Sequence, residues 1–195
     1  MKKISPHGLR GYLIMTSNLK IVVVNGRPGC GKTTFESICK KEMGAFCEII
    51  STIDVIKEIA KYGGWRGEKT PEARKLLSDL KDLFSEYNDL SFITIENFIK
   101  NWEAELMDYS VSSHPHILFV DSREPEEINR FKNKFGAITL LIRRPDVETE
   151  ELSNHADANV FEYEYDYVIH NTGSLENLKE LAKNFINLIF DKNVV

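Results

Sequence analysis

The sequence has few cysteines, no excess of positive charge and no long apolar run, and each shortage excludes a class of protein. Its three cysteines form no Cys-x-x-Cys pair, which argues against a zinc site or a thioredoxin-like centre and fits a reducing cytoplasm. The 25 Lys and Arg residues are outnumbered by 30 Asp and Glu residues, so the net charge of −5 disfavours a protein that coats nucleic acid. No apolar run approaches the roughly 18 residues that a membrane-spanning helix needs. We therefore expect a cytoplasmic protein without nucleic-acid or membrane partners.

Length and composition are those of one ordinary globular domain. The chain has 195 residues, of which 42% are hydrophobic and 28% charged, so neither a disordered chain nor a disulfide scaffold is expected. The apolar stretch at residues 11–15 is too short for a signal peptide. We expect residues 1–19 to form an N-terminal extension and residues 20–195 to form a single domain.

Five continuous apolar runs predict the strands of a sheet. A run of this kind suits a strand that is covered on both faces, as the strands of parallel sheets are. Helical segments separate the runs, which indicates a parallel α/β fold. The runs lie at residues 21–24, 46–50, 117–120, 138–142 and 167–169.

Two long excursions interrupt this alternation. Residues 52–115 are too many for one crossover and predict two or three inserted helices, one of which begins where Thr70 precedes Pro71. Residues 144–165 are polar and have no clear periodicity, which is typical of a lid.

The residues Gly26-x-x-x-x-Gly31-Lys32-Thr33 form a complete phosphate-binding loop between the first apolar run and a helical stretch. Gly29 and Gly31 allow the backbone to approach phosphate oxygens without a side chain between them. Several N–H groups and a helix N-terminus then converge on one anion site. Lys32 would add a positive charge at the β- and γ-phosphates, and the Thr33 hydroxyl would bind Mg²⁺. The loop predicts a nucleoside triphosphate as ligand.

Cys30 and Thr34 complete the set of loop residues that we expect beside the nucleotide. Cys30 precedes a helix N-terminus, which would favour a thiolate, although we interpret it as a small residue that the loop tolerates. Arg27 would either contact the bound phosphates or face solvent.

Charged residues follow two of the predicted strands. Asp121 ends the third apolar run, where an aspartate of this protein class holds Mg²⁺. Arg123 follows it, and Arg143 and Arg144 follow the fourth run, at the sheet edge where open α/β folds bind ligands. Arginines there would neutralise charge on a transferred phosphoryl group. The alternatives are a helix cap or turn for Asp121 and surface ion pairs for the arginines.

This order of features resembles nucleoside and nucleotide kinases. The segment FVDSREPEEI at residues 119–128 is especially similar to bacteriophage and bacterial deoxynucleoside monophosphate kinases, which are related to dephospho-coenzyme A kinase. Residues 153–157 and 165–175 add to the likeness. The resemblance implies a three-layer α/β P-loop fold with five parallel strands in the order 2-3-1-4-5, with ATP as donor and Mg²⁺ as cofactor.

The resemblance also implies which residues contact the acceptor. It makes residues 52–115 the acceptor-binding insertion and Asp54, Arg74 and Arg123 its candidate contacts. Asp54 could instead only cap a helix, and Arg74 could pair with nearby acidic residues. The adenylate kinase signature Asp-Gly-[Phe/Tyr]-Pro-Arg is absent, so the acceptor is not expected to bind as AMP binds in adenylate kinases.

Further implied residues lie toward the C-terminus. Asn171 and Gly173 would lie beside the donor base, although the segment is also a ready-made turn. His155 and Asp157 resemble a lid motif, although a solvated lid face fits them equally well.

Together these features predict an ATP- and Mg²⁺-dependent phosphotransferase whose acceptor is a small nucleotide, a (deoxy)nucleoside monophosphate. The alternatives are a non-catalytic ATP-binding regulatory or sensor module and a nucleoside or small-metabolite kinase. A regulatory GTPase is disfavoured, because Asn-Lys-Phe-Gly at residues 133–136 lacks the aspartate of the base-reading motif. The oligomeric state is open, and a homodimer is one alternative.

Overall fold

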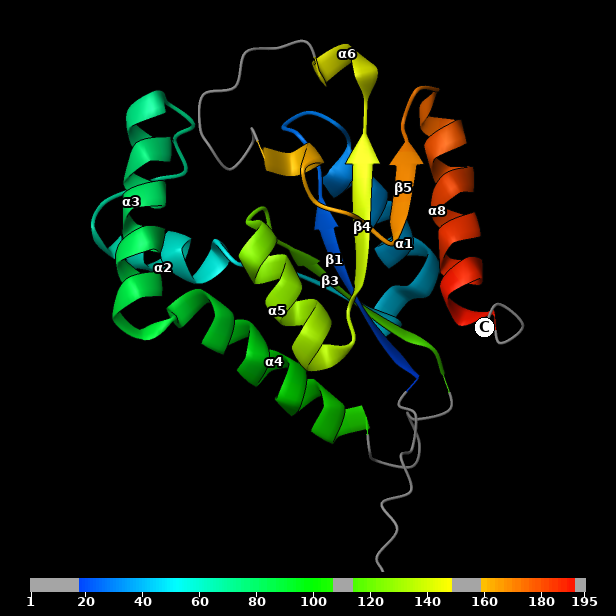
Figure 1. Ribbon diagram of the computed structural model, residues 1–195, viewed down its shortest axis with the longest axis horizontal. Coiled ribbons are helices and arrows are strands. Elements are labelled where there is room, and N and C mark those ends of the chain that lie inside the picture. Colours follow the sequence, from blue (N-terminus) through cyan, green and yellow to red (C-terminus); the bar gives the residue numbers. More distant parts are fainter. Residues whose placement is uncertain (1–17, 107–113, 149–158, 192–195) are drawn as a thin grey trace, which may run out of the picture.

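The computed structural model describes residues 18–106, 114–148 and 159–191, which are built around a five-stranded parallel sheet (Figure 1). The strand order is β2-β3-β1-β4-β5, which confirms the order 2-3-1-4-5. Each predicted apolar run corresponds to one strand, except that Phe46, the first residue of the second run, lies in the 3-10 helix before that strand. The strands are β1 Leu19–Asn25, β2 Cys47–Ser51, β3 His116–Asp121, β4 Ile138–Arg143 and β5 Tyr167–His170.

Helices cover both faces of the sheet, which makes the three expected layers (Figure 1). Side chains alternate along a strand, so β1 serves both faces. Val22 and Val24 pack with α1 and α8, whereas Ile21 and Val23 pack with α4 and α5. These helices are α1 Lys32–Met43, α4 Leu90–Leu106, α5 Pro125–Phe135 and α8 Leu175–Phe190.

Between β2 and β3 the described residues form three helices, in agreement with the prediction of two or three. They are α2 Asp54–Tyr62, α3 Pro71–Asn88 and α4. Thr70 caps α3 as predicted, since its hydroxyl accepts a hydrogen bond from the Ala73 N–H at 3.3 Å and Pro71 occupies the first turn. In Figure 1, α3 stands at the side of the domain, away from the sheet.

Short elements complete the described chain. They are the 3-10 helices η1 Gly44–Phe46 and η2 Asn159–Phe161 and the single-turn helix α6 Pro145–Glu148. Residues 1–17 of the expected N-terminal extension lie outside the described residues, as do residues 149–158 of the expected lid, which include His155 and Asp157. None of the helices in the described ranges is long and apolar enough to cross a lipid bilayer.

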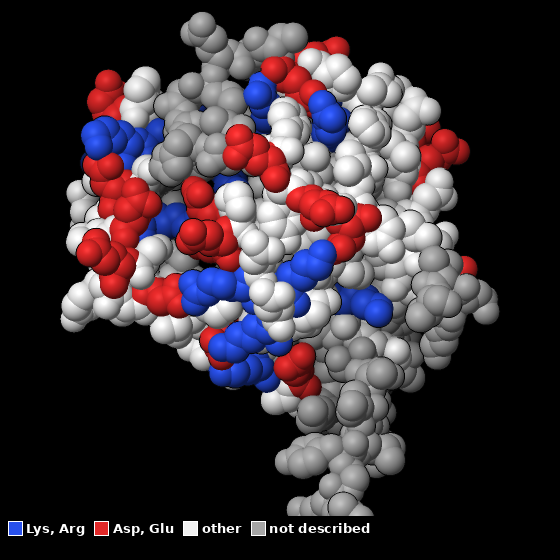
Figure 2. Space-filling model, in the orientation of Figure 1, with Lys and Arg blue, Asp and Glu red and all other residues white. Residues whose placement is uncertain are grey.

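Basic side chains gather with acidic ones over α4 and α5 on the face drawn in Figure 2. Lys132 pairs with Asp166, and Lys134 pairs with Glu96. These lysines therefore add little net positive charge to this face, because a carboxylate lies beside each of them.

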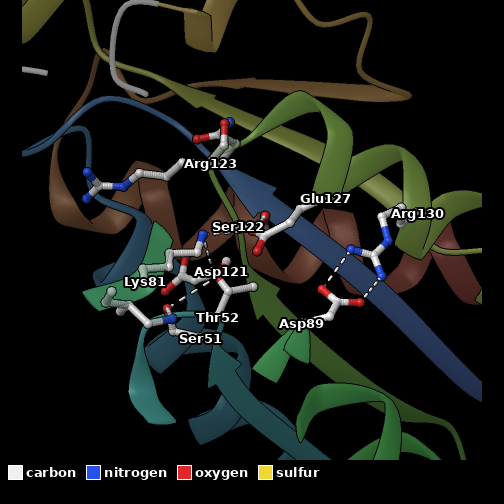
Figure 3. Close-up of polar contacts among 11 residues, drawn as sticks. Ser51, Thr52, Lys81, Asp89, Asp121, Ser122, Arg123, Glu127 and Arg130 are labelled. Atoms are coloured by element: carbon white, nitrogen blue, oxygen red, sulfur yellow. Dashed lines mark hydrogen bonds and ion pairs between the residues drawn. The ribbon is translucent and has the colours of Figure 1, made fainter. Parts of the chain in front are cut away.

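A buried polar junction connects the inserted helices to the sheet (Figure 3). Lys81 of α3 donates to Glu127 of α5 at 3.0 Å and to the Thr52 hydroxyl at 3.3 Å. The Ser122 hydroxyl donates to the same Glu127 carboxylate at 2.7 Å. None of the described residues of α3 is buried. The hydrogen bonds of Lys81 are therefore an important connection between α3 and the sheet.

Replacing Lys81 by Met should destabilise the protein. The Glu127 side chain is only 12% exposed, so the substitution leaves a largely buried carboxylate without its cation. We expect a loss of about 2–4 kcal/mol in the free energy of unfolding, measured by urea denaturation. Lys75→Met is the matched control on the same helix, because Lys75 pairs with Asp79 on the exposed surface. The control should cost about 0.3 kcal/mol. Equal losses in both variants would contradict the anchoring role of Lys81.

Candidate functional site

The loop between β1 and α1 has a backbone that only glycine can adopt at its key positions. Gly26, Gly29 and Gly31 have φ angles of 149°, 78° and 101°. A Cβ atom on Gly26 would lie 2.4 Å from the carbonyl oxygen of Ile142, and one on Gly31 would lie 2.5 Å from the Asn171 side-chain nitrogen. The glycines are therefore required by close contacts with β4 and with the segment after β5, as well as by their φ angles.

The loop leads directly into the N-terminus of α1. Gly31 precedes the first residue of this helix, and no side chain of the described residues caps it. The first N–H groups of a helix have no partner within the helix, and they form an anion site together with the helix dipole. Thr33 and Thr34 are exposed at this end. The Lys32 ammonium lies across the loop and donates to the Gly26 carbonyl at 2.5 Å.

Cys30 is a core residue of the loop. Its side chain is 1% exposed and belongs to the apolar cluster beneath α1 and α8. Burial raises the pKa of its thiol, although the nearby Lys32 charge acts in the opposite direction. These observations favour the interpretation of Cys30 as a small packing residue over a thiolate.

Asn171 supports the loop from behind. Its side-chain N–H donates to the Cys30 carbonyl at 2.9 Å, and its backbone N–H donates to the Arg143 carbonyl at 2.7 Å. Gly173 lies close to α8, since a Cβ there would be 2.8 Å from the Asn177 side-chain oxygen. Residues 170–173 and α8 line a hollow of about 380 Å³. Contact of Asn171 and Gly173 with the donor base stays a prediction.

An experiment can distinguish whether Asn171 supports the loop or contacts the donor base. If its amide holds the loop, Asn171→Ala should weaken the binding of ATP and of tripolyphosphate alike, by about fivefold, which corresponds to one hydrogen bond. Isothermal titration calorimetry measures both affinities. Asn184→Ala, in the hollow beside α8, is the control and should leave tripolyphosphate binding unchanged. Weaker ATP binding with unchanged tripolyphosphate binding in Asn171→Ala would instead favour contact with the base.

Asp121 ends β3 directly beside the loop, since it pairs in register with Val24 of β1. Its Oδ1 atom is buried and has no hydrogen-bond partner among the described residues. Burial raises the pKa of this carboxyl, and the charges of Lys32 and Arg123 act against the shift. An oxygen without a partner beside a phosphate loop suits Mg²⁺, which takes one or two protein oxygens and completes its shell with water and phosphate. Thr33 and Asp121 therefore fit the expected metal.

A larger metal cluster is not seen in the described ranges, where no group of three or more His, Cys, Asp or Glu side chains could hold an ion. This is compatible with Mg²⁺, because a nucleotide supplies phosphate oxygens to the ion.

The candidate arginines differ in their surroundings. Arg123 is exposed at the end of β3, and Figure 3 shows its guanidinium directed away from Glu127. Arg143, at the end of β4, forms two hydrogen bonds with the Glu148 carboxylate, at 2.9 and 2.5 Å. Arg144 contacts Asp146 at 3.4 Å. Thus Arg143 and Arg144 both contact acidic residues of α6.

Four residues form a cluster beside the phosphate loop, which we call the clasp: Arg27, Arg143, Glu148 and Phe161. The guanidinium groups of Arg27 and Arg143 lie 5.0 and 4.6 Å from the ring centre of Phe161. Arg27 also donates to the Glu148 carbonyl. The clasp therefore joins the loop, β4, α6 and η2. No local pattern in the sequence indicates Glu148 or Phe161 as its members.

The Glu148 carboxylate should compete with phosphate for Arg143. We expect Glu148→Gln to bind ATP about two- to fivefold more tightly, because a charged hydrogen-bonded competitor is lost. Asp146→Asn is the control, and its binding should be unchanged since Asp146 pairs with Arg144 at a longer distance. Calorimetry at low ionic strength measures the difference. Weaker binding in Glu148→Gln would show that the pair holds Arg143 ready for the nucleotide.

Asp54 and Arg74, the candidate acceptor contacts, lie on different helices. The Asp54 carboxylate accepts a hydrogen bond from the Ser51 N–H at 2.9 Å and pairs with Lys57 at 2.9 Å, so it stabilises the start of α2. Its charge also acts on Asp121. Arg74 is exposed near the start of α3. The structure thus brings Asp54 close enough to Asp121 for their charges to interact.

The sequence matches no protein-family model and no curated protein sequence. Solved structures do match. TT1252 from Thermus thermophilus has a TM-score of 0.50 at 15% identity, covering 87% of this chain and 97% of that one. Shikimate kinase from Acinetobacter baumannii has a TM-score of 0.46 at 16% identity, with coverages of 92% and 97%. A sugar kinase from Janibacter has a TM-score of 0.46 at 18% identity, with coverages of 87% and 95%.

The chain has a three-layer α/β fold with five parallel strands in the order 2-3-1-4-5, and TT1252 is similar to it in fold. Identities this low show the fold alone, and the strand order and the glycine loop agree with it. The fold that the resemblance implied is therefore confirmed.

Proposed function

We propose that the protein is an ATP- and Mg²⁺-dependent phosphotransferase that transfers the γ-phosphoryl group to a (deoxy)nucleoside monophosphate. One observation carries the proposal. The glycine loop, Lys32 and an Asp121 oxygen that has no hydrogen-bond partner among the described residues lie together at the carboxyl ends of the central strands. This is the place where open α/β sheets bind their ligands.

The loop amides and Lys32 would bind the phosphates of ATP. For this, Lys32 exchanges its hydrogen bond to the Gly26 carbonyl for one to a phosphate oxygen. Thr33 and Asp121 would hold Mg²⁺, which neutralises phosphate charge when it is bound. The chemistry requires positioning and electrostatics more than a covalent nucleophile.

The acceptor would be bound by residues of the inserted helices and by Arg123, which follows β3. Arg123 and Arg74 would attract the phosphate of an acceptor nucleotide, and Asp54 would contribute a hydrogen-bond acceptor. Arg143 and Arg144 would neutralise the moving charge after they exchange their carboxylate partners on α6. The similarity of residues 119–128 to deoxynucleoside monophosphate kinases favours this acceptor class over shikimate or sugars.

The test is an acceptor screen by a coupled assay of ADP release. Nucleoside monophosphates, nucleosides, shikimate and sugars are each supplied with ATP and Mg²⁺. We expect release that depends on a nucleoside monophosphate and falls by about 10²–10⁴-fold in Lys32→Ala, since the main phosphate cation is lost. Lys40→Ala is the control on the exposed part of α1, where Lys40 pairs with Glu48.

Other outcomes would change the assignment. Release that depends on another acceptor would correct the substrate class and keep the phosphotransferase. Tight ATP binding without stimulation by any acceptor would favour a non-catalytic ATP-binding module. Absence of ATP binding would overturn the proposal as a whole.

A further inference from the structure

A buried glutamate of α1 lies one turn behind the phosphate loop. Glu36 is 1% exposed, and its Oε1 atom has no hydrogen-bond partner in the described part of the chain. Residues three and four apart lie on the same face of a helix, so Glu36 follows Thr33 and Lys32 on the face that they share. The sequence analysis did not single it out, because a polar residue in a helix gives no local sign of burial.

Glu36 lies within the electrostatic environment of Asp121 and Lys32. Burial raises the pKa of the Glu36 carboxyl, the negative charge of Asp121 raises it further, and the Lys32 charge lowers it. Asp121 likewise has a buried oxygen without a partner, as noted above. Two buried carboxyl groups, one from α1 and one from β3, thus lie within the influence of Lys32, and the charges of Arg123 and Lys57 also act on Asp121.

This arrangement is costly without a ligand. A buried carboxylate loses its hydration, and it stays ionised only where it is paired, hydrogen-bonded or bound to a metal. Among the described residues, neither Glu36 Oε1 nor Asp121 Oδ1 accepts a hydrogen bond, whereas the Lys32 ammonium donates to the Gly26 carbonyl. Two such oxygens suit a divalent cation, whose preferred ligands are carboxylate oxygens and water.

We propose that Glu36 is a positioning residue of the Mg²⁺ site, where its carboxylate would accept a hydrogen bond from water bound to the ion that Asp121 would hold. This inference rests on the proposed nucleotide site and does not depend on which acceptor is used. The phosphate-loop motif itself does not include Glu36, so a role for this residue at the metal site would be additional to the motif.

The test measures metal binding directly. Free Mn²⁺ is followed by electron paramagnetic resonance while the protein, saturated with a non-hydrolysable ATP analogue, is titrated with Mn²⁺. We expect Glu36→Gln to raise the dissociation constant of Mn²⁺ by about tenfold, as loss of an outer metal contact does. Binding of the analogue in EDTA should stay within about twofold of wild type. Glu42→Gln is the matched control, since Glu42 lies on the same helix and pairs with Lys183 at the surface.

The outcomes are distinguishable. Unchanged Mn²⁺ affinity in Glu36→Gln would overturn the inference and leave the proposed function intact, since Glu36 would then be a neutral buried carboxyl. Absence of Mn²⁺ and analogue binding in the wild-type protein would overturn both. Thermal unfolding reports whether Glu36→Gln folds; if it does not, Glu36→Asp retains the charge at a shorter reach. An intermediate Mn²⁺ affinity in Glu36→Asp is then expected, and wild-type affinity would contradict the role.

Discussion

The site depends on the close approach of backbone at two glycines. Gly26 lies against the Ile142 carbonyl of β4, and Gly31 lies against the Asn171 side chain. Both contacts are too short to admit a Cβ atom, and both hold the loop so that the start of α1 lies at the carboxyl edge of the sheet. Because the contacts join the loop to β4 and to the segment after β5, the sheet order is a condition for the anion site. The loop is therefore a product of tertiary packing as much as of its own sequence.

Cationic groups at the site already have partners within the protein. Lys32 donates to a loop carbonyl, and Arg143 is held by Glu148. Binding of a polyphosphate therefore exchanges one set of charged hydrogen bonds for another, and the affinity reflects the difference between the two sets. Two carboxyl groups near the loop differ from these cations. Glu36 and Asp121 each have a buried oxygen without a partner in the described ranges, which is the feature that most directly suggests a cation.

The inserted helices are held differently from the phosphate loop. The loop is enclosed by buried strands and by α1 and α8, whereas α3 has no buried residue in the described chain and contacts α2 and α4. Its connection to the sheet includes the Lys81–Glu127 junction, which reaches the ends of β2 and β3 through Thr52 and Ser122. A helix with few apolar contacts can shift at modest cost. We therefore expect the phosphate loop to be held more rigidly than α3.

Local features of the sequence determined the five strands, the capped start of α3 and the phosphate loop, because apolar runs, capping residues and glycine spacing act over a few neighbouring residues. The strand order came from resemblance, not from periodicity. Only the tertiary structure decided that Asn171 supports the loop at Cys30, that Arg143 pairs with Glu148 beside Phe161, and that Glu36 is buried near Asp121. These pairs join different elements, in one case 141 positions apart, and no short pattern records which elements will meet. Packing of the two helical layers on the sheet brings them together.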